Sequence, residues 1–456
     1  MDLFIETHLA CQDDEDSESM AKNSTNGPES LRSTLGEYSP CGFFTKTWFE
    51  PDMLRKGAPN SPTYEQYWYV WSTILHEWVH HLQMVGTTYG RFHYDISLLA
   101  GGCTSAAIRQ LIEIRPRDQL RRPLLQDLMD ARHDIDEDSL LAGARALRIR
   151  QAFWRSGPGT SPVQYRGIAL PQSAPSPRVI VEGKKHALGA VHILEGHARS
   201  NELVNLVMTA GRESFCEALE KLGELDPYRL VEELITARLV VDDEMLCRII
   251  CDIALNPPWP AEDREVPWED FHPGWRMVRI VDALKDTRRF RTLLPHLADE
   301  GRLEDYHSLY EGILNHFGWQ RPEQILSASA DCFPWYTNKV VEIRTKSPLA
   351  FALNVEHLPL LQKAFPISVD EYVPEDLNTL FASGMDPLTE FEARRVVARI
   401  FEKTVYEMLN LRTLTCPIHL TVFPSAAGCP SRCAFQGFFK STFGITVDQF
   451  CAIPFR

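Results

Sequence analysis

The segment from Ser61 to Gly86 most constrains the fold, because it carries the signals of one long helix. Ser61 is a favoured N-cap residue, Pro62 suits the first helical position, and apolar residues then recur at helical spacing as far as Gly86. Similar helical patterns follow along the chain, so we predict a mainly α fold. The other predicted helices cover residues 94–114, 124–154, 188–222, 227–255, 275–293 and 303–317.

Composition along the chain divides it into three regions. Residues 1–40 are acidic and rich in Ser and Asn, and we expect a disordered tail there. Residues 41–345 contain most of the helical patterns, and residues 346–456 combine further helices with a small, irregular, Cys-rich C-terminal module. Within the middle region, residues 156–185 are rich in Pro, Ser and Gly and predict a lid or binding loop, with a strand at RVIVEG, residues 178–183.

The charge balance excludes some classes of partner. With 62 acidic and 47 basic residues the net charge is -15, which disfavours binding to nucleic acid and to anionic membranes. The N-terminal sequence lacks the basic and apolar regions of a secretion signal, and no apolar run approaches the roughly 20 residues of a membrane helix. We expect a cytoplasmic protein whose 11 cysteines are mainly reduced thiols.

The later half of the long predicted helix contains the sequence HEWVH, residues 76–80. His76 and His80 lie about 40° apart on one face of a helix, with Glu77 on the flank of that face. Two imidazoles in this arrangement can bind one zinc ion while the neighbouring carboxylate reaches a metal-bound water. An ordinary helix that happens to carry these residues is the alternative. His81 lies about 100° further round and is not expected to bind the metal.

The apolar residues of this helix are separated from the histidines. We expect the side opposite the histidines to pack against the core. The histidine side carries mixed residues instead of Lys, Arg and Glu, which suits the wall of a cleft. This separation favours a metal site over a pair of core histidines. The residues of the opposite side are Trp71, Ile74, Leu75, Trp78, Leu82 and Val85.

A third candidate ligand, Glu195, lies in a predicted helix within the sequence LEGHA. HEWVH together with this Glu-Gly-x-Ala segment resembles the metal-binding motifs of gluzincin-type zinc metallopeptidases. The resemblance implies a zincin-like helical metallopeptidase core in the middle region, with zinc bound by His76, His80 and Glu195. The two motifs are further apart than in the best-known gluzincins, which implies long helical insertions. Gly196 beside the ligand is expected to let the two helices approach closely.

The activity that the resemblance implies is zinc-dependent hydrolysis of a peptide or amide bond. Glu77 would act as the base that activates the zinc-bound water. The substrate would be a peptide, a protein or an amide-bearing small molecule. Oxyanion stabilisation in such sites comes from a Tyr, His or Arg side chain, and the candidates are Tyr89, Arg199 and Tyr336.

Further polar residues share the helix face of Glu195, and two interpretations fit them. They support the metal ligands through hydrogen bonds, or they form a solvated face with ion pairs at i, i+4 spacing. These residues are His192, Arg199 and Glu202.

A second zinc site is predicted near the C-terminus, where two pairs of soft ligands flank a loop rich in Pro and Gly. Such a set fits a small structural zinc site, and buried thiols are an equally good explanation. Its residues are Cys416, His419, Cys429 and Cys433. Cys247 and Cys251 also lie at i, i+4 spacing, but in a hydrophobic helix, which favours core packing.

Two other functions remain open from the sequence. Residues 269–272 and 304–307 are further Glu-x-x-His segments, and di-iron carboxylate oxygenases or oxidases use two such segments on facing helices. Against this, Pro273 follows the first segment directly and places its histidine at a helix boundary, and a di-iron centre gives His76 no role. The other function is that of a non-catalytic, zincin-like binding scaffold, which would bind metal without needing Glu77.

Overall fold

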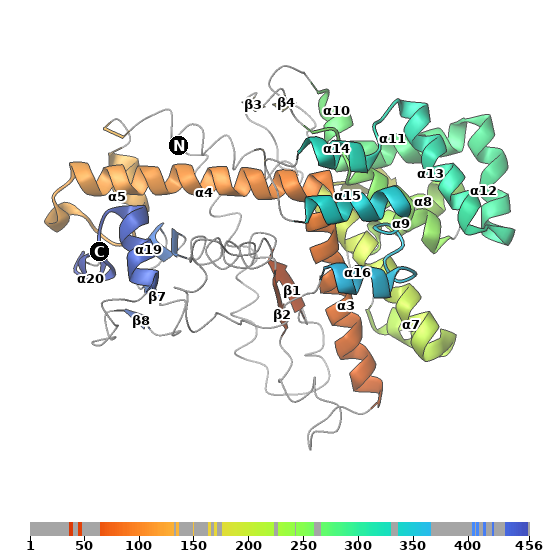
Figure 1. The fold of residues 1–456 in the computed structure, drawn as a ribbon, viewed down its shortest axis with the longest axis horizontal. Coiled ribbons are helices and arrows are strands. Elements are labelled where there is room, and N and C mark those ends of the chain that lie inside the picture. Colours follow the sequence, from red (N-terminus) through yellow and green to blue (C-terminus); the bar gives the residue numbers. More distant parts are fainter. Residues whose placement is uncertain are drawn as a thin grey trace. The chain divides into compact units, whose positions relative to one another are not determined.

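The computed structural model is mainly helical (Figure 1). Helices account for 73% and strands for 5% of the described residues, which confirms the expected mainly α fold. None of the described helices is long and apolar enough to cross a membrane. The described residues are 36–39, 44–47, 64–131, 134–135, 149, 163–165, 168–170, 176–222, 227–241, 243–259, 266–329, 336–365, 404–405, 407–409, 414–415, 422–423 and 434–454.

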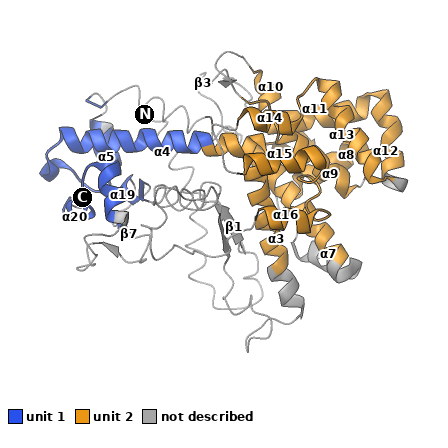
Figure 2. Ribbon diagram, viewed as in Figure 1, with its two compact units in different colours: residues 1–11, 95–148, 371–456 blue, residues 12–94, 149–370 orange. Residues whose placement is uncertain are grey.

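The chain divides into two compact units (Figure 2). Unit 1 comprises residues 1–11, 95–148 and 371–456, and unit 2 comprises residues 12–94 and 149–370. This division differs from the regions drawn from composition, because each unit joins segments that are far apart in the sequence. Gly36–Ser39, at the end of the region expected to be a disordered tail, forms strand β1 and pairs with Phe44–Thr47. The rest of that tail lies outside the described residues.

Among its described residues, unit 2 combines helices with three antiparallel pairs of strands. The pairs are β1 with β2 (Phe44–Thr47), β3 (Val163–Tyr165) with β4 (Ile168–Leu170), and β5 (Arg178–Val181) with β6 (Lys184–Ala187). The strand expected at RVIVEG is therefore confirmed as β5. The helices are α3 (Tyr64–Gly86), α7 (Ala190–Leu222), α8 (Leu230–Leu239), α9 (Glu244–Ala254), α10 (Trp268–Phe271), α11 (Pro273–Asp286), α12 (Arg288–Glu300), α13 (Leu303–Phe317), α14 (Pro322–Ala328), α15 (Thr337–Lys346) and α16 (Leu358–Ala364).

Unit 1 has a hydrophobic core of its own. Side chains of α4 (Thr88–Ile114), which begins in unit 2, are buried together with those of α19 (Ala434–Phe443) and α20 (Val447–Cys451). This packing explains why residues 95–148 group with the C-terminal part of the chain. The remaining described elements of unit 1 are a 3-10 helix (Arg117–Gln119), α5 (Leu125–Asp130), and the paired strands β7 (Leu414–Thr415) and β8 (Val422–Phe423).

The predicted helix 124–154 ends early, since α5 stops at Asp130 and turn or bend residues follow at 131, 134 and 135. Two further predicted helices are interrupted. Residues 227–255 form α8 and α9, because Val240 adopts a left-handed conformation with φ of 56° that ends α8. Asp243 then begins α9 by accepting hydrogen bonds from two backbone N–H groups of the first turn, at 2.9 and 3.1 Å. Residues 275–293 divide into α11 and α12 at Thr287. The apolar period continues across both breaks, so the period alone could not reveal them.

Helix α3 packs along α7 and is buried on both of its sides around the HEWVH motif. On the expected core side, Trp78 is buried and donates its indole N–H to the backbone oxygen of Phe365 at 3.0 Å. Trp71, at the edge of that side, is 43% exposed. On the other side, the three polar residues of the motif are only 6–8% exposed. The motif is therefore largely buried, and a small exposed fraction remains on its polar side.

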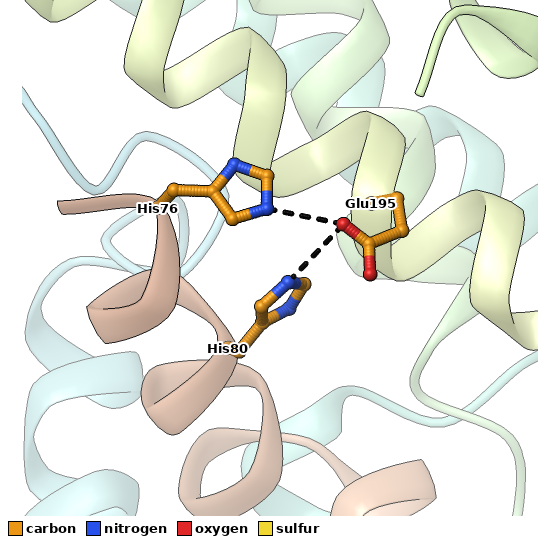
Figure 3. Close-up of side chains that lie close together, drawn as sticks. All are labelled: His76, His80 and Glu195. Carbon is orange, nitrogen blue, oxygen red and sulfur yellow. Dashed lines mark hydrogen bonds and ion pairs between the residues drawn. The ribbon is translucent and has the colours of Figure 1, made fainter. Parts of the chain in front are cut away.

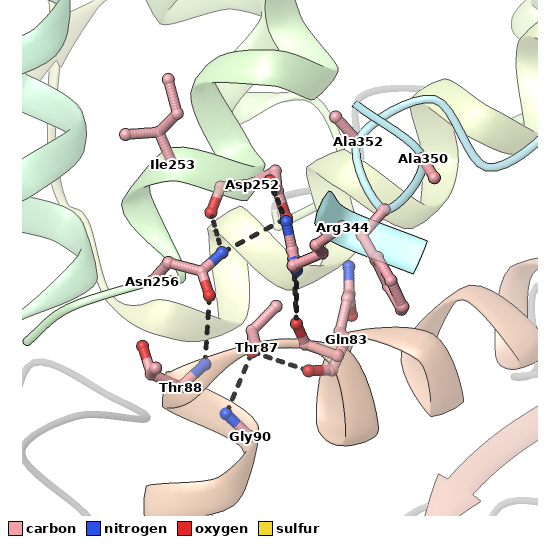
Figure 4. A network of polar contacts seen from close by, with 12 residues as sticks. Gln83, Thr87, Thr88, Gly90, Asp252, Ile253, Asn256, Arg344, Ala350 and Ala352 are labelled. Atoms are coloured by element: carbon pink, nitrogen blue, oxygen red, sulfur yellow. Dashed lines mark hydrogen bonds and ion pairs between the residues drawn. The ribbon is translucent and has the colours of Figure 1, made fainter. Parts of the chain in front are cut away.

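A network of polar contacts holds the end of α3 (Figure 4). Arg344 donates from Nε and Nη2 to the backbone oxygen of Gly86, at 3.1 and 2.9 Å, and from Nη1 and Nη2 to the Asp252 carboxylate, at 3.0 and 2.8 Å. The last carbonyl groups of a helix have no partner within the helix, so this guanidinium completes the end of α3. Only glycine fits at position 86, because a Cβ there would lie 2.3 Å from the ring of Phe351.

The same network fixes the bend between α3 and α4 (Figure 4). The Thr87 hydroxyl donates to the backbone oxygen of Gln83 at 2.6 Å and accepts from the backbone N–H of Gly90 at 3.1 Å. The backbone N–H of Thr88 donates to Asn256 Oδ1 at 3.2 Å. Side chains thus satisfy the N–H groups of Thr88 and Gly90 at the start of α4, and the N–H of Tyr89 donates to the backbone oxygen of Leu255 at 3.1 Å. The chain turns sharply one residue after α3 ends.

We expect Arg344→Met to destabilise unit 2 strongly, because the buried Asp252 carboxylate and the Gly86 carbonyl would lose their donors. Removing one partner of a buried ion pair costs about 3–5 kcal/mol. The free energy of unfolding in urea measures this. Lys346→Met is the matched control, since the Lys346 ammonium pairs with Glu342 on the same helix but is 73% exposed. Equal effects of the two variants would contradict a special role for the buried pair.

Candidate metal centre

Three side chains from two helices converge on one point in unit 2 (Figure 3). His76 and His80 lie one turn apart on α3, and Glu195 lies in the second turn of α7. Glu195 Oε2 is 3.0 Å from His76 Nε2 and 3.3 Å from His80 Nε2. Within the described part of the chain, this is the one group of His, Cys, Asp or Glu side chains close enough together to hold a metal ion.

The spacing of these atoms fits a tetrahedral ion. Zinc binds His nitrogen and carboxylate oxygen at about 2.0–2.2 Å, so two ligand atoms on a tetrahedron around it lie about 3.3–3.6 Å apart. The distances of 3.0 and 3.3 Å between Glu195 Oε2 and the two imidazole nitrogens are close to this spacing. Three protein ligands leave one tetrahedral position open, as in catalytic zinc sites.

The outer nitrogen of His76 is held by Glu202. Glu202 Oε2 lies 3.2 Å from His76 Nδ1, and the Ser72 hydroxyl donates to Glu202 Oε1 at 2.6 Å. An ionised carboxylate only accepts hydrogen bonds, so His76 Nδ1 donates to Glu202, and Nε2, which faces Glu195, is the nitrogen left to bind a proton or a metal. Of the two interpretations of the polar face on α7, support of the ligand holds for Glu202. Because Ser72 precedes His76 while Glu202 follows Glu195, α3 and α7 run antiparallel here.

The outer nitrogen of His80 is held by Gln83, whose Oε1 lies 2.8 Å from His80 Nδ1. With both outer nitrogens donating, two neutral rings would direct their Nε2 lone pairs at the Glu195 carboxylate. Three acceptors would then face one another with no hydrogen between them. The cluster therefore requires positive charge at its centre, supplied by protons on the rings or by a metal ion that replaces them.

The pKa values of His76, His80 and Glu195 are shifted by burial and by the charges and hydrogen bonds among these side chains. Burial alone would lower the pKa of His76, but the hydrogen bonds and charges of Glu195 and Glu202 raise it well above its ordinary value. Burial would also lower the pKa of His80, but the charge and the hydrogen bond of Glu195 raise it above its ordinary value. The pKa of Glu195 falls far below its usual range, because the two histidines outweigh the effect of burial. The Glu195 carboxylate thus stays ionised, as a metal ligand must.

Glu77 is buried beside the three candidate ligands. Burial raises the pKa of its carboxyl group, while the charges of His76 and His80 act in the opposite direction. A raised pKa brings this carboxylate toward the range in which a general base works best near neutral pH. Its charge also acts on the hydroxyl group of Tyr228, which places both side chains at the same site.

Tyr228 is a residue of the site that the sequence did not reveal. It lies in the turn before α8, is half-buried, and has its ring centroid 5.8 Å from that of His76. Burial, and then the charges of Glu195, Glu77 and Glu202, raise the pKa of the Tyr228 hydroxyl above its ordinary value. The hydroxyl is therefore a neutral hydrogen-bond donor at neutral pH. The surrounding sequence DPYR has no motif or period that connects it with HEWVH.

Arg199, one of the candidate oxyanion stabilisers, lies on α7 between Glu195 and Glu202 and is 4% exposed. Burial would raise the pKa of Glu202, but the hydrogen bonds from His76 and Ser72 and the charge of Arg199 lower it. Arg199 Nε has no hydrogen-bond partner among the described residues. Arg199 is thus close enough to the site for its charge to act on Glu202. Its role in catalysis stays a prediction.

The other two candidate oxyanion stabilisers lie against other side chains. Tyr89 is buried at the start of α4, with its ring 6.0 Å from that of His93. Tyr336 begins α15, with its ring 5.3 Å from that of Phe365 and 6.5 Å from that of His81. Their catalytic roles stay predictions. His81 packs edge-on against Tyr336 and is absent from the candidate ligand group, as expected.

Gly196 does not have the role expected from the sequence. A Cβ at this position would lie 3.0 Å from the Cβ of Val231. The glycine therefore admits the close approach of α8, and the expectation that it brings α7 close to α3 is wrong. His192, from the same face as Glu195, accepts a hydrogen bond from the backbone N–H of Gly189 at 3.0 Å and so holds the start of α7.

The other Cys and His residues considered in the sequence either have structural contacts or lie outside the described residues. Cys247 and Cys251 are free, buried cysteines of α9, which confirms core packing. His272 is buried and begins α11, where its Nδ1 accepts from the backbone N–H groups of the next turn at 3.1 and 3.4 Å. Neither residues 269–272 nor residues 304–307 contribute to the candidate metal group found within the described ranges. Outside those ranges lie Cys416, His419, Cys429 and Cys433.

No family model matches the chain, and no curated protein or solved structure matches it significantly. The geometry and chemistry of the site are therefore the basis for its function.

We expect Glu202→Leu to weaken zinc binding about 10–100-fold, because His76 would lose the acceptor that orients its ring. Glu202→Gln retains an acceptor oxygen and should lose less. Competition with a chromophoric chelator measures the affinity. Glu113→Leu is the control, since Glu113 pairs with Arg109 on α4 and is 59% exposed. An unchanged affinity in Glu202→Leu would contradict the support of His76 by Glu202.

Proposed function

We propose that unit 2 contains a zincin-like catalytic centre that hydrolyses a peptide or amide bond, with zinc bound by His76, His80 and Glu195. The convergence of these side chains carries the proposal, since Glu195 Oε2 lies 3.0 and 3.3 Å from the two Nε2 atoms. The outer nitrogens of both imidazoles are already occupied by hydrogen-bond acceptors. Two histidines, one glutamate and an open fourth position are the composition of a gluzincin-type catalytic site.

The residues of this chain would divide the chemistry between them. Zinc, when bound, supplies Lewis acidity toward the scissile carbonyl and lowers the pKa of water. Glu77 takes the proton of the attacking water and later returns it to the leaving amine. Burial keeps Glu77 basic enough for this step, and its position next to His76 holds base and ligand on one rigid helix.

Tyr228 is the best-placed candidate for oxyanion stabilisation. Its neutral hydroxyl is a donor, and its ring lies 5.8 Å from the ring of His76. A donor beside the metal can bind the negative charge that develops on the carbonyl oxygen in the transition state. Arg199, whose charge acts on Glu202 and on the Tyr228 hydroxyl, is the second candidate.

The proposal also includes the setting in which this centre works. The substrate is a peptide, a protein or an amide-bearing small molecule, and the proposed location is the cytoplasm. A second, structural zinc at Cys416, His419, Cys429 and Cys433 remains part of the proposal.

No observation on the described residues favours a di-iron oxygenase or oxidase. His272, which that interpretation needs as a ligand, accepts backbone hydrogen bonds at the start of α11. A non-catalytic scaffold differs from the proposed enzyme in one respect, since it would bind metal and not need Glu77.

We expect Glu77→Gln to retain zinc and to lose hydrolysis by about 10²–10⁴-fold or more, because the amide cannot take up the proton of water. Cleavage of a peptide and amide library, with zinc and iron content measured on the same samples, tests this. Glu113→Gln on α4 is the matched control and should retain activity. Retained hydrolysis in Glu77→Gln would overturn the mechanism, and two irons per chain would support the di-iron alternative.

We expect Tyr228→Phe to lower kcat about 10²-fold with little change in KM or zinc content, because only the transition state needs the hydroxyl donor. Steady-state kinetics on a substrate from the library measures both constants. Tyr306→Phe serves as the control, because the Tyr306 hydroxyl donates to Asp243 at 2.6 Å at the start of α9. A change in KM alone would exclude the oxyanion role of Tyr228.

A further inference from the structure

We infer that Gln83 and His197 are positioning residues that fix the proton of His80 on Nδ1 and so present its Nε2 lone pair to the metal. The inference rests on the proposed function and assigns roles to two buried side chains that are not themselves candidate ligands. It follows from the direction of four hydrogen bonds and does not depend on any change of protonation.

The direction of the Gln83 amide is fixed by a backbone carbonyl. Gln83 Nε2 lies 2.9 Å from the backbone oxygen of Leu194. A carbonyl oxygen only accepts, so the NH₂ group must face it, and Gln83 Oε1 must face His80 Nδ1 at 2.8 Å. Turning the amide over would place its oxygen against the Leu194 oxygen within the buried interior, which is strongly unfavourable.

The direction of His197 is fixed by a second backbone carbonyl. His197 Nε2 lies 3.0 Å from the backbone oxygen of Ala352, so this nitrogen carries the hydrogen. His197 Nδ1 lies 3.0 Å from Gln83 Nε2 and accepts its second N–H. Both hydrogens of the Gln83 amide are therefore used, one by Leu194 and one by His197.

These bonds form one relay with a single direction. It runs from His197 to Gln83 to His80, and each donor and acceptor follows from the two carbonyls of Leu194 and Ala352. His80 Nδ1 must then donate, which leaves Nε2, 3.3 Å from Glu195 Oε2, as the nitrogen available to the metal.

Gln83 also connects the second histidine ligand to the helix of the third ligand. Leu194 directly precedes Glu195 on α7, so the bond from Gln83 to the Leu194 oxygen holds α3 and α7 in register beside the site. The orientation of the His80 ring and the position of the Glu195 carboxylate are thus set by one side chain.

The far end of the relay is itself held in place. The backbone N–H of Asn354 donates to Asn201 Oδ1 at 3.1 Å, and Asn201 Nδ2 donates to the backbone oxygen of His197 at 3.0 Å. Arg248 of α9 pairs with Glu356 at 2.7 Å. The segment that contains Ala352 is therefore bound to α7 and α9, and its carbonyl has a fixed position for His197.

Nitrogen-15 NMR of histidine-labelled protein tests the direction of the relay in the wild-type chain. We expect His197 to carry its proton on Nε2 with and without zinc, and His80 to carry its proton on Nδ1 when zinc is bound. A proton on His197 Nδ1, or zinc on His80 Nδ1, would overturn the inference.

Zinc affinity of variants tests the consequence for the metal. Gln83→Met should weaken zinc binding about 10–100-fold. Gln126→Met is the control, since Gln126 Nε2 donates to Asp130 at 2.8 Å on the exposed side of α5 in unit 1, and it should bind zinc as the wild type does. Equal affinities of the Gln83 and Gln126 variants would overturn the inference.

A pair of substitutions at His197 separates the acceptor from packing. Asn and Leu are similar in size and both lose the bond to Ala352, but only Asn retains an acceptor near the position of Nδ1. We expect His197→Asn to bind zinc more tightly than His197→Leu, by about tenfold. Equal affinities would show that His197 acts only by packing.

The outcomes distinguish this inference from the proposed function. If the wild type binds zinc and hydrolyses its substrate through Glu77 while the Gln83 and His197 variants bind zinc equally well, the inference fails and the function stands. If the wild type binds no zinc, both fail.

Discussion

The burial of two carboxylates of α7 against two histidines of α3 is the interaction on which the rest of the site depends. Glu195 and Glu202 can remain ionised inside the protein only because positive charge and hydrogen-bond donors surround them. His76 connects the two carboxylates, since each of its nitrogens faces one of them. The same contacts therefore hold α3 against α7 and require a cation between the side chains.

The surroundings of this interaction hold α3 in one position. At the end of the helix, Arg344 binds the Gly86 carbonyl and the buried Asp252, and the bend into α4 follows at once. Beside the ligands, Gln83 binds the backbone of α7 and orients the second histidine. A metal site needs ligands placed to within a few tenths of an ångström, and these bonds supply the rigidity.

The sequence reveals the parts of the site that are close together on one helix or marked by a motif. His76, Glu77 and His80 follow from helical spacing, and Glu195 from the resemblance of its segment. Tyr228 could not be found in this way, because it comes from a turn with no motif and reaches the site only through the packing of α8. The role expected for the glycine after Glu195 was wrong for the same reason, since its neighbour is a third helix.

The sequence by itself determined the mainly helical character, the long helix with HEWVH on one side, and the residue types for a metal site, because helical period and residue chemistry are local properties. Only the tertiary structure decided that Glu195 meets both imidazoles, that Glu202 and Gln83 hold their outer nitrogens, and that the chain divides into units joining distant segments. These features depend on which helices pack together, and packing partners leave no period in the sequence.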